Sequence, residues 1–172
     1  LCGTMSVGKT TLVNALKELD QFKDYKFATE RSQHLMSLGI PLNTDSTLKG
    51  QTVFLAERCG ELMHDSIITD RTILDVMAFT INAKSIPHQD KEAFETYASE
   101  FIREYDYIFY ISPHGLEIED NGVRETDEHY RDLIDFTITT LIKRHGHKAG
   151  TIEKISGSTE ERIQQILNVT KL

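Results

Sequence analysis

An eight-residue segment close to the start of the chain restricts the folds that this chain can adopt. It reads G-T-M-S-V-G-K-T, from Gly3 to Thr10, and it matches the pattern G-x-x-x-x-G-K-[ST]. In this pattern the glycines let the backbone wrap a phosphate group closely, and successive amide N–H groups point at its oxygens. Residues 9–19 continue with apolar side chains at helical spacing, and a helix N-terminus favours bound anions. The segment is therefore predicted to be a phosphate-binding loop, the Walker A motif or P-loop, that holds a nucleoside triphosphate.

The side chains of this loop have separate expected roles. Lys9 supplies an ammonium group for the β and γ phosphates, and Thr10 offers a hydroxyl group to Mg²⁺. The alternative, a glycine-rich turn without a ligand, is disfavoured by the amphipathic helix that follows. The residues predicted to bind the nucleotide are Gly3, Met5, Ser6, Val7, Gly8, Lys9, Thr10 and Thr11.

Strand patterns and helix patterns alternate along the rest of the chain. Apolar runs typical of strands occupy residues 25–29, 66–69, 105–111 and 151–155. Their alternation with helical stretches predicts a three-layer α/β/α fold of the P-loop NTPase type, with a five-stranded parallel sheet in the order 2-3-1-4-5. We expect one domain over residues 1–172. Because only two residues precede Gly3, we also expect residues upstream of Leu1 to complete the first strand.

The charge balance of the chain bears on its partners. Lys and Arg total 19 and Asp and Glu total 27, which gives a net charge of −8. Proteins that bind duplex nucleic acid usually present a basic surface, so this balance disfavours a polynucleotide partner and suits a small anionic ligand in a locally basic cleft. Cys2 and Cys59 form neither a disulfide framework nor a zinc pattern. With no apolar run long enough to span a membrane and no signal peptide, this favours a cytoplasmic location without a membrane partner.

Two of the predicted strands end in an acid followed by an arginine. The pairs are Glu30-Arg31 and Asp70-Arg71. In open α/β sheets ligands bind at the carboxyl ends of the strands, so both pairs are expected beside the phosphate loop. A carboxylate there can hold Mg²⁺ or accept a proton from a hydroxyl group, and an arginine can stabilise a transferring phosphoryl group. The alternatives are a first-turn helix acid for Glu30 and a helix N-cap for Asp70.

A family resemblance rests on the segment T-D-R-T-I-L-D-V-M-A-F-T, residues 69–80. It resembles the D-R-[ST]-x-x-D segment of small P-loop nucleoside and nucleotide kinases, most closely the ribosylnicotinamide-kinase-like ATPase/kinase proteins of phages and bacteria. The resemblance implies that Glu30 is the general base and that Asp70 and Arg71 organise the metal ion and the phosphates. It also implies that Asp75 faces the acceptor, with a surface helix acid as the alternative. By the same resemblance, the candidates for contacts to an acceptor base are Gln51 and Phe54.

The long irregular segment from Ser112 to Arg131 is predicted to be a lid. Its D-N-G-V-R sequence, followed by a second arginine, resembles the lid of the same kinases. A cover that carries Arg124 and Arg131 would exclude water from the γ-phosphate and neutralise charge in the transition state. The alternative is a solvated loop in which Arg131 pairs with an acid of its own helix.

These features together predict an enzyme, a transferase. We expect an ATP-dependent kinase that uses Mg²⁺ and transfers the γ-phosphoryl group to a nucleoside, a nucleotide or a related small acceptor. The expected catalytic residues are Lys9, Glu30, Asp70, Arg71, Arg124 and Arg131, with Thr10 and Asp70 at the metal ion. Two alternatives stay open, a kinase of DNA or RNA hydroxyl groups and a regulatory P-loop NTPase or nucleotide-sensing module. The sequence leaves the acceptor, the choice between ATP and GTP, and a homodimeric state open.

Overall fold

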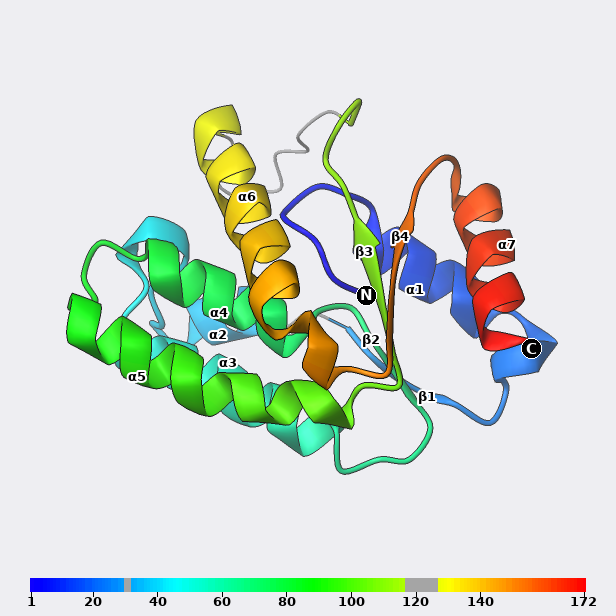
Figure 1. Cartoon of the computed structure of the whole chain (residues 1–172), viewed down its shortest axis with the longest axis horizontal. Helices are drawn as coiled ribbons and strands as arrows, with labels where there is room; N and C mark the ends of the chain where they lie inside the picture. Colours follow the sequence, from blue (N-terminus) through cyan, green and yellow to red (C-terminus); the bar gives the residue numbers. More distant parts are fainter. Residues whose placement is uncertain (30–31, 117–126) are drawn as a thin grey trace.

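The computed structural model describes residues 1–29, 32–116 and 127–172. The α-helices are α1 (Lys9–Lys17), α2 (Ser32–Ser37), α3 (Leu48–Glu61), α4 (Ile73–Asn82), α5 (His88–Ala98), α6 (Glu128–His145) and α7 (Thr159–Thr170). The strands are β1 (Lys26–Ala28), β2 (Ile67–Thr69), β3 (Tyr107–Ile111) and β4 (Thr151–Ile155). Short 3-10 helices lie at Asp20–Phe22, Asn43–Asp45, Ser99–Glu104 and Gly146–Lys148. Figure 1 shows the strands at the centre, with α1 and α7 on one side and α3 to α6 on the other, so the described elements form three layers.

The described strands form two parallel pairs, and the first two residues of the chain lie between them. β1 pairs with β2, and β3 pairs with β4. The amino group of Leu1 donates to the carbonyl of Thr69 over 2.7 Å. Cys2 bonds β3 from the other side, since its N–H donates to Phe109 and its carbonyl accepts from Ile111, each over 2.9 Å. The phosphate loop therefore starts between the carboxyl ends of β2 and β3, while the single five-stranded order stays a prediction.

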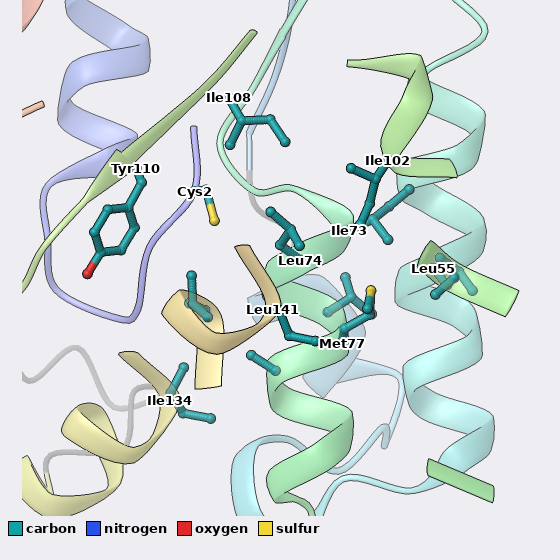
Figure 2. Close-up of a cluster of buried hydrophobic side chains, with 14 of the residues drawn as sticks. Cys2, Leu55, Ile73, Leu74, Met77, Ile102, Ile108, Tyr110, Ile134 and Leu141 are labelled. Atoms are coloured by element: carbon teal, nitrogen blue, oxygen red, sulfur yellow. The ribbon is translucent and has the colours of Figure 1, made fainter. Parts of the chain in front are cut away.

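Helix α4 is the centre of the larger apolar core. Seven of its ten residues are buried, because α3, α5 and α6 all pack against it. Figure 2 shows its side chains Ile73, Leu74 and Met77 within the cluster of buried side chains. Burying each such side chain contributes about 1.5–3 kcal/mol to folding. A smaller core lies between the strands and the α1–α7 layer. The beginning of α4, directly after β2, is thus held in one position.

The four strands predicted from the sequence are confirmed, with shifts of at most two residues at their ends. At the start of α7, Ser158 and Glu161 bond each other in a capping box. The N-cap of α3 is Thr47, whose hydroxyl accepts from Gly50. Within the described residues, none of the helices has the length and apolar character needed to cross a membrane.

Candidate functional site

The phosphate loop joins the first two residues to α1 and depends on both of its glycines. Gly3 has a φ of 152°, and a Cβ atom there would lie 2.6 Å from the carbonyl oxygen of Ile111. Gly8 has a φ of 80° and is the N-cap of α1. Helix α1 carries no acid in its first turn and no side-chain cap, so its N-terminal amides are left for another acceptor. This is the backbone geometry that an anion such as phosphate requires.

Lys9 lies inside the loop. Its ammonium group donates to the carbonyls of Gly3 and Thr4 over 2.7 Å and 2.6 Å, and the side chain is buried. Burial lowers the pKa of Lys9 to about 8, and the charge of Arg71 acts in the same direction. The negative charges of Asp75 and Asp70 oppose that shift. The ammonium group of Lys9 is therefore held inside the loop, where phosphates would bind.

Thr10 and Asp70 meet, as the positions of the loop and of β2 predict. The hydroxyl of Thr10 donates to Oδ2 of Asp70 over 2.5 Å, and Asp70 is buried at the end of β2. The interpretation of Asp70 as a helix cap is wrong, because α4 has Thr72 as its N-cap. A hydroxyl and a carboxylate are ligands that Mg²⁺ accepts, with phosphate oxygens and water at its other positions. A small hollow is lined by Met5, Ser6, Val7, Gly8, Lys9, Thr10, Asp70 and Arg71.

Arg71 and Asp75 lie at the start of α4. The guanidinium of Arg71 stacks over the ring of Phe79, 5.1 Å from its centroid, and lies 4.0 Å from the carboxylate of Asp75. The interpretation of Asp75 as a surface acid is wrong, because its side chain is fully buried. Its Oδ1 accepts the backbone N–H of Gly3 over 3.0 Å. Gly3 was predicted to bind the nucleotide, but its backbone N–H donates to Asp75 within the protein.

Only the two ends of the segment predicted to be a lid lie within the described residues. Arg131, in the first turn of α6, is buried and donates to the carbonyl of Leu116 over 2.8 Å. Its own carbonyl accepts from the hydroxyl of Thr4 over 3.2 Å, so the end of the segment predicted to be a lid contacts the phosphate loop. Glu30 and Arg124 lie outside the described residues. Their predicted roles as general base and lid arginine stay predictions.

The match to a known family agrees with this geometry. Residues 1–162 match the sequence model of a family described as an AAA domain. The chain belongs to the AAA domain family. No curated protein matches this AAA domain by sequence.

Two solved structures of a deoxyadenosine kinase from M. mycoides are similar to this AAA domain. The first, with bound dCTP, has 17% identity and a TM-score of 0.66, and the match covers 99% of this chain and 96% of that chain. The second, with the products dCMP and a flexible dCDP, has 18% identity and a TM-score of 0.67, covering 98% and 95%. At these identities the likeness shows a shared α/β fold. The predicted closeness to ribosylnicotinamide-kinase-like proteins stays a prediction.

One contact of the AAA domain's loop was not expected from the sequence. Arg162, on α7, is buried and donates from Nη1 to the carbonyl of Val7 over 2.8 Å. The same nitrogen would lie 3.2 Å from a Cβ atom at Gly8. The available signal is a spacing of four residues between Arg162 and the buried Ile166, which puts an arginine on the apolar face of an amphipathic helix. A buried arginine in that position needs an acceptor, and here the acceptor is the phosphate loop.

Arg162→Met is expected to loosen the phosphate loop of the AAA domain. It leaves the Val7 carbonyl without its partner, at a cost of about 1–3 kcal/mol in the free energy of unfolding. We expect a lower Tm in thermal unfolding and ATP affinity reduced by about tenfold, since the loop loses a fixed position. The control is Arg103→Met, which removes an exposed ion pair with Glu100 and should change neither quantity by much. Equal effects in the two variants would contradict a role for Arg162 at the loop.

Proposed function

We propose that this chain is an ATP-dependent kinase that transfers the γ-phosphoryl group to a nucleoside, a nucleotide or a related small acceptor. The observation that carries the proposal is the hydrogen bond from Thr10 to Asp70, because it joins the phosphate loop to the acidic end of β2. Arg71 follows directly and lines the same hollow as Lys9. The fold shared with the two deoxyadenosine kinase structures supports the same class of reaction.

In this proposal each residue has a separate role. The loop amides and Lys9 hold the triphosphate, and Thr10 and Asp70 hold Mg²⁺, which neutralises charge on the phosphates. Glu30 accepts the proton of the acceptor hydroxyl. The hydroxyl oxygen forms a bond to the γ-phosphorus, and ADP leaves. Three arginines stabilise the transferring phosphoryl group in the transition state: Arg71, Arg124 and Arg131. A sheet in the order 2-3-1-4-5, a lid that closes over the site and a cytoplasmic location belong to the same proposal.

A nucleoside-type acceptor is supported by the helices that follow the site. Gln51 on α3 is buried with an amide that can bond a base edge, and Phe54 on the same helix packs against the larger core. Phe79 of α4 lies under Arg71 and 6.4 Å from the ring of Tyr130, which gives an aromatic wall beside Arg71. The kinase structures that share the fold contain bound deoxycytidine nucleotides.

The test is a transfer assay with ATP labelled on the γ-phosphate. We expect label in a nucleoside or a mononucleotide when a panel of both is offered with Mg²⁺. Label in the 5′ ends of oligonucleotides instead would favour a polynucleotide kinase. Label in free phosphate alone, whatever the acceptor, would overturn the kinase proposal and favour a regulatory NTPase. Lys9→Met, assayed beside the wild type, controls for a contaminating kinase.

Glu30→Gln is expected to remove transfer while sparing ATP binding. The amide keeps the shape of the side chain but cannot accept a proton, and loss of a general base costs about two to four orders of magnitude in kcat. The dissociation constant of ATP, measured by calorimetry, should stay within about twofold of wild type, since Glu30 acts on the acceptor. The control is Glu92→Gln, at an exposed position of α5. If Glu30→Gln keeps a wild-type rate, another residue is the base.

A further inference from the structure

Asp75 connects two parts of the chain that lie 72 residues apart in sequence. It is the third residue of α4, and its side chain is fully buried. Oδ1 accepts the N–H of Gly3 over 3.0 Å. Oδ2 accepts both the N–H and the hydroxyl of Thr72, each over 2.8 Å. One carboxylate oxygen thus bonds the phosphate loop, and the other bonds the start of its own helix.

Capping a helix does not by itself require such a buried carboxylate. Another capping box, formed by Ser158 and Glu161 at the start of α7, lies at an exposed position. Burying a carboxylate is costly unless its oxygens are bonded, and the hydrogen bond to Oδ1 of Asp75 comes from Gly3, with the guanidinium of Arg71 4.0 Å away. The bond to Gly3 therefore goes beyond what the helix needs for its own start.

We propose that Asp75 is a positioning residue that fixes the phosphate loop against the segment carrying Asp70 and Arg71. That segment spans only the residues between β2 and α4, so its position follows from the start of α4. The same carboxylate bonds that start and the first glycine of the loop. Asp75 thereby fixes the position of the phosphate loop relative to Asp70 and Arg71. The inference needs nucleotide binding only, so it survives if the proposed transfer fails.

The experiment measures binding of ADP without metal to Asp75→Asn by calorimetry. An asparagine can accept with one atom only, so either the loop or the helix start loses its partner. We expect affinity for ADP to fall by about tenfold or more, because a loop displaced by about an ångström binds poorly.

Thr72→Val is the matched control. It removes the hydroxyl bond at the same helix start but leaves the charge of Asp75 and its bond to Gly3. We expect a lower Tm, with ADP affinity close to that of the wild type. If Asp75→Asn behaves the same way, Asp75 is a helix cap alone and the proposal is overturned.

A second variant decides the matter if Asp75→Asn does not fold. Asp75→Glu keeps the charge and both oxygens but moves them by about one methylene group. We expect ADP affinity to fall by about tenfold, since the displaced carboxylate moves the first glycine of the loop. Wild-type affinity in this variant would overturn the proposal.

Discussion

Replacing Lys9 with methionine is expected to lower phosphoryl transfer by about two to three orders of magnitude. Methionine has nearly the same length and no charge, so the loop keeps its volume but loses its ammonium group. In the structure that group donates to the carbonyls of Gly3 and Thr4, inside the hollow where phosphates are proposed to bind. Positive charge fixed at that point is worth most in the transition state, when charge on the transferring group is redistributed.

The pH dependence of ATP binding separates this role from a general weakening of the loop. Lys9 has a pKa of about 8 in the folded protein, so its charged form is present below that pH and is lost above it. Wild-type affinity should therefore decline above about pH 8, and Lys9→Met should be weak and flat over the same range. The control is Lys17→Met, at the exposed end of α1. A steep alkaline decline that persists in Lys9→Met would show that another group titrates.

The phosphate loop could be predicted from the sequence because its determinants are consecutive. Gly3, Gly8, Lys9 and Thr10 each act through backbone geometry or a side chain within a few residues, and the following helix confirms the context. The meeting of Thr10 with Asp70 was also predictable, since parallel strands bring their carboxyl ends to one edge of the sheet. Such rules specify which chain segments meet.

The partners of the loop could not be predicted in the same way. Asp75 and Arg162 reach the loop from helices 72 and 155 residues away, and their spacing within those helices fits an ordinary cap and an ordinary amphipathic face. Whether an acid at the third position of a helix is exposed or buried depends on what packs over it, which is a property of the tertiary fold. For the same reason the cap of α4 is Thr72 although Asp70 is an equally good capping residue.

Asp70→Asn is expected to lower transfer by about a hundredfold or more, because the metal ion loses its carboxylate ligand. The replacement suits the fold, since an asparagine Oδ1 can still accept the hydroxyl of Thr10. Binding of ADP without metal should therefore stay within a few-fold of wild type, whereas the concentration of Mg²⁺ needed for half-maximal transfer should rise. Transfer assays over a range of Mg²⁺ concentrations and calorimetry with metal-free ADP measure the two effects separately.

Asp65→Asn is the control for this test, since Asp65 is exposed in the turn before β2. It should leave both the rate and the Mg²⁺ dependence unchanged. Transfer by Asp70→Asn should recover in part at high Mg²⁺, whereas transfer by Lys9→Met should not. Added Mg²⁺ compensates for weaker metal binding but not for a missing ammonium group, so this result would assign the loss in Asp70→Asn to the metal ion. An unchanged Mg²⁺ requirement in Asp70→Asn would contradict metal binding by Asp70. In that case its bond to Thr10 serves only to join the end of β2 to the first turn of α1.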